Sequence, residues 1–254
     1  MTIVNQSTPT FPVHDVPITR PFIWLGRGWS DIRSNPAPSL AYGWLVASMG
    51  ALVLAYFHHP VYAAATIVAY LFVGPVITAG VCELSRRRDH GEKASFQTSL
   101  TGLSVSRRSL CLFAGLLLLL AAVWFALAAL LLYMTSGAIA PEITATLWGD
   151  VVNQLSRAQL LVYSLALATL AGVVFAVSVV TVPMIVDRHV DVGTAVSTSL
   201  RTTVRNWATL MLWALLVVAL VVFGFATWML GMILIVPLLE HATWHAYRDI
   251  VEEE

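Results

Sequence analysis

Residues 109–141 read SLCLFAGLLLLLAAVWFALAALLLYMTSGAIAP and contain no Asp, Glu, Lys or Arg. A helix that crosses the hydrocarbon of a bilayer needs about 20 apolar residues, and a run of 18 or more is a candidate span. Three further uncharged stretches exceed that length, at residues 34–82, 158–186 and 206–239. The fold that this pattern predicts is all-α, a polytopic bundle of transmembrane helices.

The composition agrees with a membrane protein. Apolar residues make up 58% of the 254 residues and charged residues only 11%, against roughly 25% charged in an ordinary soluble domain. The formal net charge is zero, so no overall basic field attracts nucleic acid, and we expect no nucleic-acid partner. The first 38 residues hold charges and prolines but no apolar core of the kind that a cleaved signal peptide requires.

The first uncharged stretch is long enough for two spans. His58-His59-Pro60 lies near its middle, and proline disfavours helical conformation at the residue before it. We therefore predict spans at about 40–57 and 61–82, joined by a polar turn. Two single spans follow, at about 110–134 and 160–186.

The last stretch, 206–239, would reach about 51 Å as one helix at 1.5 Å per residue. That is too long for a hydrocarbon core of about 30 Å, even with a tilt of roughly 20°. Two short spans, 207–223 and 225–244, with a tight turn near Gly224, fit better. The prediction is therefore six spans, and five is the alternative.

Positive charge then orients the bundle. With six spans, the only basic residue on one side is Arg157. The other side receives Arg20, Arg27, Arg33, Arg86, Arg87, Arg88, Lys93, Arg107, Arg108, Arg188, Arg201, Arg205 and Arg248. Because Lys and Arg accumulate in cytoplasmic loops, both termini are predicted to be cytoplasmic. The domains are then a cytoplasmic segment with an interfacial helix (1–38), a six-span domain (39–246) and an acidic cytoplasmic tail (247–254).

A short amphipathic segment precedes each predicted hairpin, beginning near Leu25, Phe96 and Val196, with apolar residues at i, i+4 and i+7 or i+8. This spacing puts them on one helical face, which is typical of a helix at the membrane interface. The tripeptide Thr-Ser-Leu recurs at residues 98–100 and 198–200. Three duplicated units are one interpretation, and independent interfacial helices with a chance tripeptide are the other.

Two motifs carry a resemblance to a known family. Gly26-Arg-Gly-Trp29-Ser-Asp31, followed by Pro36, precedes the first span, and Ser197-Thr-Ser-Leu-Arg201 with Arg205-Asn206-Trp207 leads into the fifth. Together they resemble a proteobacterial family of predicted integral membrane proteins of unknown function, over about residues 14–250. The resemblance implies six spans in the bacterial inner membrane. Some members are loosely labelled as related to cytochrome oxidases, and no catalytic residues carry over.

His241 and His245 are the candidate metal ligands. Histidines four residues apart lie on one helical face, but a stable zinc site needs three or four donors. Glu83, Asp187 or His189 would have to supply the others. The alternative is that both histidines are interfacial polar residues that close the last span, and in that case we expect no haem, metal or other cofactor.

The basic loop after the second span is the other candidate site. Arg86, Arg87, Arg88, Lys93, Arg107 and Arg108 are predicted either to bind lipid headgroups or a phosphorylated ligand, or simply to set the topology. Cys82 and Cys111 lie beside this loop, where a reducing cytoplasm would keep them as thiols.

Three functional classes remain open. The first is a non-catalytic accessory or assembly subunit that binds membrane lipids and other inner-membrane subunits. It fits the lack of Asp, Glu, Lys and Arg in the central turns of the first five spans. The second is a transporter or channel for a small apolar or lipid-like solute, favoured by prolines late in three spans. The third is a haem- or metal-binding redox protein. We favour the first, and we expect no enzyme activity.

Overall fold

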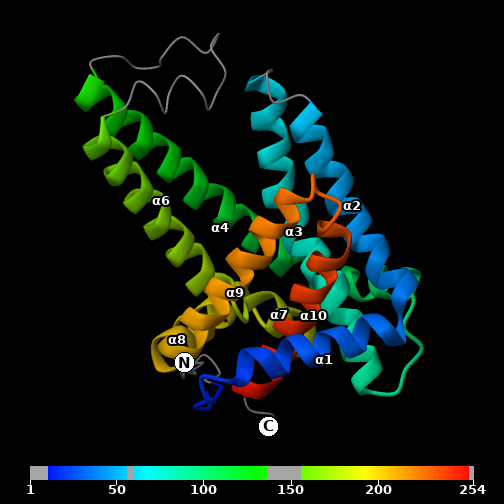
Figure 1. Cartoon of the computed structure of the whole chain (residues 1–254). Coiled ribbons are helices and arrows are strands. Elements are labelled where there is room, and N and C mark those ends of the chain that lie inside the picture. The colour runs from blue at the N-terminus through cyan, green and yellow to red at the C-terminus, as the bar shows by residue number, and fades with distance from the viewer. Residues whose placement is uncertain (1–10, 56–59, 137–155, 252–254) are drawn as a thin grey trace, which may run out of the picture.

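The computed structural model of this chain describes residues 11–55, 60–136 and 156–251. The described residues form helices and no strands, so the all-α prediction is confirmed for them (Figure 1). One isolated antiparallel bridge joins Val13 to Val251, near the two ends of the chain. The helices are α1 (Arg20–Ser34), α2 (Pro36–Ala55), α3 (Pro60–Asp89), α4 (Phe96–Ser136), α6 (Arg157–Ser178), α7 (Thr181–Arg188), α8 (Val192–Arg205), α9 (Trp207–Ala226) and α10 (Met232–Ile250).

Five helical stretches of the described residues are long and apolar enough to cross a membrane, which agrees with a polytopic membrane protein. They are Pro36–Ala55, Val68–Asp89, Leu103–Leu127, Arg157–Arg188 and Trp207–Ala226. Helix α10 is not among them, because its 19 residues include three charged side chains, those of Glu240, Arg248 and Asp249. The sixth span therefore stays a prediction.

The predicted division of the first uncharged stretch into two helices is confirmed. Helix α2 ends at Ala55 and α3 begins at Pro60, and proline suits a first helical position because its missing N–H would have no partner there. Residues 56–59, which include His58 and His59, lie outside the described residues. The amphipathic segment that begins at Phe96 is no separate helix, since it continues into the span as the 41-residue α4.

The predicted span 160–186 consists of two helices. Helix α6 ends at Ser178 and α7 begins at Thr181. The break follows from Pro183, whose ring clashes with the carbonyl group four residues earlier, at Val179. Pro75 and Pro237 lie inside α3 and α10 without ending them.

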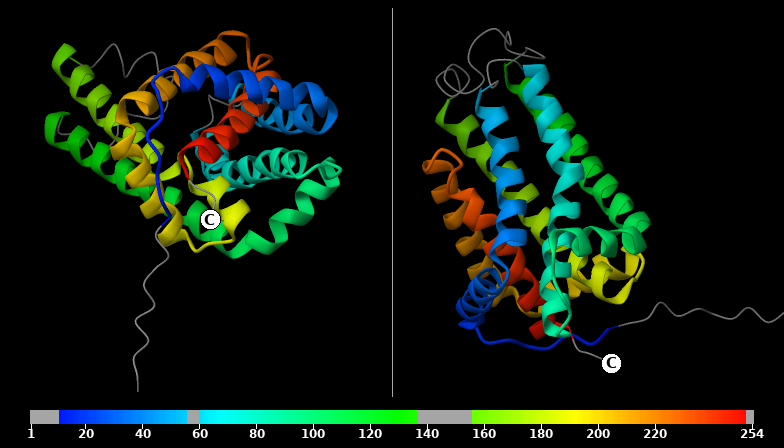
Figure 2. Two further views of the ribbon diagram at one scale, coloured as in Figure 1. Left: turned by 90° about the horizontal axis from the view of Figure 1, so that it is seen from below. Right: turned by 90° about the vertical axis from the view of Figure 1, so that its right-hand side faces the viewer.

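The turn between α9 and α10 begins at Thr227 rather than at Gly224. Gly224 belongs to α9, and a Cβ atom there would lie 2.7 Å from the sulfur of Met232, so the glycine lets α10 approach. The turn itself uses Trp228 and Met229 at φ of 54° and 69°. Figure 2 shows that this hairpin ends short of the tips of α2 and α3.

Two short helices, α1 and α8, lie at the end of the bundle where both described ends of the chain meet. Seen from below in Figure 2, they flank α10 from two sides. Helix α1 packs closely on α10, because a Cβ atom on Gly28 would lie 2.9 Å from the backbone nitrogen of Ala242. This contact brings the polar residues of α1 against the polar half of α10.

Candidate functional site

Polar side chains from four helices meet in the interior of the bundle, at the end that α1 covers. We call this set the polar cluster: Asp31 on α1, Ser39 on α2, Ser85 and Arg88 on α3, and His241 and His245 on α10. Asp31 is 2% exposed and His241 is 1% exposed, and both serines are fully buried. Burial of polar groups is costly unless each finds a hydrogen-bonding partner, so the contacts within the polar cluster decide its stability.

The carboxylate of Asp31 is the centre of the polar cluster. Its Oδ2 accepts a hydrogen bond from the Ser85 hydroxyl at 2.5 Å and lies 3.1 Å from the Nε2 of His245. The guanidinium of Arg88 pairs with its Oδ1. One buried negative charge therefore has donors from α3 and α10, and these donors tie α1 to both helices.

Both ring nitrogens of His241 are engaged by hydroxyl groups. Its Nδ1 lies 2.6 Å from the Ser85 oxygen, and its Nε2 lies 2.9 Å from the Ser39 oxygen. Because the single hydroxyl hydrogen of Ser85 points to Asp31, the Nδ1 of His241 must be the donor to Ser85. The hydrogen bonds from His241 through Ser85 to Asp31 thus have a defined direction.

The contacts from Ser39 to Asp31 follow the order of a nucleophile, a base and an orienting acid in a catalytic triad. A nucleophile must also reach its substrate, whereas Ser39 is fully buried and its hydroxyl lies 2.8 Å from the Asn35 carbonyl oxygen. The geometry therefore suits a structural polar junction rather than acyl transfer. The sequence does not single out Asp31, Ser39 and Ser85 as site residues, because their partners in the polar cluster lie at least 54 positions away in the chain.

The structure places the candidate metal ligands on one face of α10, as predicted, but gives them other partners. His241 contacts two serines and His245 contacts Asp31. Among the described residues, no group of three or more His, Cys, Asp and Glu side chains is arranged to hold a metal ion. Of the proposed further ligands, Glu83 binds two arginines, Asp187 accepts from Tyr247 at 2.6 Å, and His189 contacts Ser106 at 3.2 Å.

Beyond the polar cluster, the last turns of α10 make a second series of polar contacts. The indole of Trp244 donates to Asp89 on α3 at 2.8 Å. Asp249 accepts from the indole of Trp24 at 2.8 Å and pairs with Arg20 and Arg27, all from α1. The C-terminal half of α10 is therefore joined to α1, α2, α3 and α7 by polar side chains.

Burial shifts the acid–base behaviour of groups at this end of α10. It lowers the pKa of His245 to about 4, and nearby Arg27 and Arg88 act in the same direction, while Asp89 and Asp249 oppose them. Burial likewise raises the pKa of Tyr247, as does the neighbouring Asp187 carboxylate. Both side chains are thus neutral at neutral pH.

The six basic residues of the candidate lipid site divide into two groups. Arg86 and Arg87 bind the buried Glu83 at 2.7 and 2.8 Å, and Arg88 belongs to the polar cluster. The other three, Lys93, Arg107 and Arg108, are exposed. The triple-arginine run therefore neutralises acids of this chain, which its sequence pattern does not reveal.

The two sequence motifs acquire structural roles. Asp31 ends the first motif, and Arg205 of the second pairs with Asp15 at 2.8 Å. The amide of Asn206 accepts from the backbone N–H of Val16 at 2.9 Å and donates to the carbonyl of His14 at 2.8 Å. These contacts fix residues 14–16 across the junction between α8 and α9.

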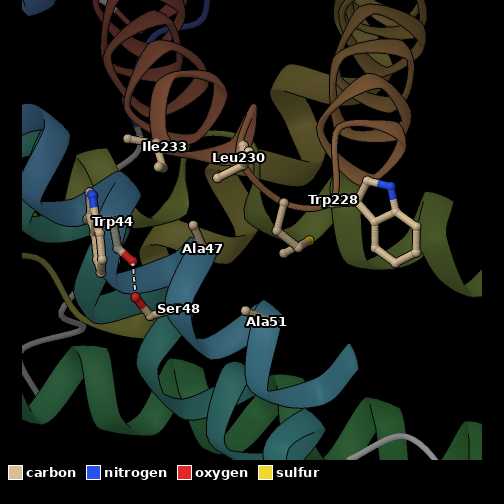
Figure 3. A pocket seen from close by; sticks show the side chains of 8 residues that line it. Trp44, Ala47, Ser48, Ala51, Trp228, Leu230 and Ile233 are labelled. Carbon is tan, nitrogen blue, oxygen red and sulfur yellow. Dashed lines mark hydrogen bonds between the residues drawn. The ribbon is translucent and has the colours of Figure 1, made fainter. Parts of the chain in front are cut away.

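A small pocket of about 140 Å³ opens between α2 and the α9–α10 turn. Figure 3 shows Ala47, Ser48 and Ala51 along one face of α2, with Leu230 and Ile233 on the opposite wall. Trp44, Trp228 and Met229 complete its lining, and the Ser48 hydroxyl is satisfied by the Trp44 carbonyl at 2.8 Å. The pocket is therefore largely apolar and separate from the polar cluster.

Comparison with known proteins agrees with the membrane assignment. The model of a family described as "Predicted integral membrane protein (DUF2189)" matches residues 61–187, half of the chain. The chain belongs to this family. The matched region contains Ser85 and Arg88 of the polar cluster, whereas both sequence motifs and α10 lie outside it. No curated protein and no solved structure matches the chain.

Proposed function

We propose that this protein is a non-catalytic accessory or assembly subunit of a larger complex in the bacterial inner membrane. The observation that carries the proposal is the contrast between the two parts of the bundle. In an 18-residue apolar stretch of each of the spans Leu103–Leu127 and Trp207–Ala226, only 17% and 22% of the residues are buried within the chain. At the end of the bundle that holds the polar cluster, by comparison, the polar side chains of α10 have partners on α1, α2, α3 and α7.

Helix α9 shows the uncovered surface most clearly. Met211, Leu215, Val218 and Val222 follow one another at intervals of three or four residues, and each is between 56% and 60% exposed. Such spacing forms one continuous apolar stripe. A stripe of this kind faces either lipid tails or the helix of another subunit, and helices in a membrane associate by close van der Waals packing.

The proposal includes six spans and cytoplasmic termini. Helix α10 runs back from the α9 turn to the end that holds both described chain ends, which supports a hairpin (Figure 1). The distribution of thirteen basic residues against Arg157 supports the orientation.

The proposed threefold repeat gains support from equivalent contacts. The Ser99 hydroxyl near the start of α4 meets the Tyr42 hydroxyl of α2 at 2.7 Å. The Ser199 hydroxyl of α8 donates to the Ala176 carbonyl of α6 at 2.7 Å. Gly28 of α1 meets α10. Each amphipathic segment thus packs on the hairpin of another proposed unit, in a cyclic order.

Transport or handling of a small apolar or lipid-like solute is the second candidate. The pocket beside Ala47 and Ala51 favours it, because its lining is apolar and it opens at the side of α2. A haem- or metal-binding redox role at His241 and His245 is the third, and the hydroxyl partners of His241 speak against it.

The test is purification of the tagged chain from its native membrane in a mild detergent, followed by mass spectrometry and an absorption spectrum of the same sample. A stoichiometric membrane partner is the expected result. A bulky substitution on the α9 stripe, Leu215→Trp, should release that partner, whereas the same change at Leu165 on the exposed face of α6 serves as the control. A pure, colourless chain with bound lipid would refute the proposal and favour the second candidate, and a haem band would favour the third.

A further inference from the structure

Two arginines near the start of the long apolar span in α4 face away from the protein. Arg107 and Arg108 are both exposed, and neither forms an ion pair with any residue that the structure describes. Arg86, Arg87 and Arg88 in the preceding helix are instead neutralised by Glu83 and Asp31. The positive charge of this region that no described acid neutralises therefore lies on Lys93, in the loop before α4, and on the two arginines of α4.

The position of the arginines around α4 identifies the surface that they occupy. Ser106, Leu110 and Phe113 face the interior, with exposed fractions of 5%, 3% and 1%. Leu112 and Leu119 face outward and are 57% and 59% exposed. At 3.6 residues per turn, Arg108 precedes Leu112 by one turn on the same face, so it continues the outward apolar stripe of the span.

The position along α4 sets the depth. The apolar stretch Leu103–Leu127 includes both arginines in its first turns, so their Cα atoms lie near the boundary between headgroups and hydrocarbon. Arginine at such a depth extends its aliphatic stem along apolar surface and places its guanidinium among the headgroups. The guanidinium is a planar donor that matches two phosphate oxygens at once.

We propose that Arg107 and Arg108 form a binding surface for the phosphate groups of anionic phospholipids. Two observations choose this partner over a soluble protein or a free phosphate. The charges are unpaired and positive, and the side chains beside them on the same face, Val105 at 69% exposed and Leu112, are apolar. A phospholipid is the ligand that brings a negative group and acyl chains to one surface.

The experiment compares thermal unfolding of the whole chain in detergent micelles doped with phosphatidylglycerol or with phosphatidylcholine. Wild type is expected to gain a larger increase in Tm from phosphatidylglycerol. R107Q/R108Q should lose more than half of that difference, and R108Q should lose part of it. K93Q is the control, because Lys93 is an exposed charge in the loop before α4 and lies outside the apolar stretch Leu103–Leu127.

Four results would overturn the proposal. They are an equal Tm increase with both lipids, an unchanged increase in R107Q/R108Q, an equal loss in K93Q, or the same increase with inorganic phosphate in place of lipid. If R107Q/R108Q does not purify as a single species, native mass spectrometry of R108Q beside K93Q decides the question. Fewer phosphatidylglycerol molecules retained by R108Q than by K93Q supports the surface, and equal retention refutes it.

Discussion

Neutralising Asp31 by the substitution Asp31→Asn should destabilise the junction between α1 and α10. The asparagine keeps the shape of the side chain but removes the negative charge that Arg88 pairs with, and it weakens the acceptor for Ser85 and His245. Removal of one partner from a buried ion pair costs about 3–5 kcal/mol. The side chain of Arg88 is 34% exposed, and solvent screening of that charge reduces the expected loss to about 2–3 kcal/mol.

A loss of that size corresponds to a decrease in Tm of roughly 5–10 °C, since 1 kcal/mol shifts Tm by about 2–4 °C in a chain of this length. The assay is fluorescence-monitored unfolding of the purified protein in detergent. The matched control is Asp15→Asn, which breaks the exposed pair with Arg205 and should leave Tm unchanged. An Asp31→Asn variant that melts with wild type would show that the polar cluster is not the junction that the contacts indicate. An equal loss in Asp15→Asn would show that the effect does not depend on burial.

Three further predictions follow from packing, titration and exposure. Gly43→Ala places a Cβ atom 2.0 Å from the Ile233 carbonyl oxygen and should cost about 1–3 kcal/mol in the same unfolding assay, whereas Gly115→Ala meets nothing within 4 Å and should cost nothing. The pKa of His245 is lowered to about 4 in the folded protein, so as pH falls the unfolded chain, whose histidine has the ordinary pKa of about 6.5, takes up the proton first. The free energy of unfolding should therefore be highest above about pH 6.5 and decrease by up to about 3 kcal/mol as pH falls toward 4. A flat pH profile in wild type, or an equally steep one in His245→Asn, would contradict this. A membrane-permeant maleimide should label the exposed Cys111 but reach the buried Cys82 only after denaturation, and mass spectrometry of labelled peptides reads out both.

The apolar runs predicted the membrane-embedded helices well because one rule governs them. A helix that meets lipid must be apolar for about 20 residues, and that requirement is visible locally in the sequence. The division between α2 and α3 follows from Pro60 for the same reason, since proline acts on its immediate neighbours. The structure differs from the prediction where a distant part of the chain makes contact. The α9–α10 turn begins at Thr227 and not at Gly224, because Gly224 lies inside α9 and packs against Met232 of α10.

The polar cluster could not be predicted in this way. His241 and His245 show a helical spacing that points equally to a metal, and the sequence offers no sign that Ser39 and Ser85 occupy the nitrogens of His241. The one available signal was Asp31, a lone acid just before the first span. A buried carboxylate requires partners, but which distant residues supply them depends on how the helices cross.

Their acidic partners separate Arg86, Arg87 and Arg88 from the proposed lipid-binding pair on α4. Sequence treats Arg86–Arg88 and Arg107–Arg108 alike, as basic residues of one loop. In the structure, Glu83 and Asp31 lie within reach of the first group and are each 2% exposed, so those arginines satisfy acids that would otherwise be buried without a counter-charge. Substitutions in the first group should therefore act on folding, and substitutions in the second should act on lipid response at nearly unchanged stability. A lipid titration of R87Q beside R108Q distinguishes the two roles in one measurement, because only R87Q should lower Tm in the absence of added lipid.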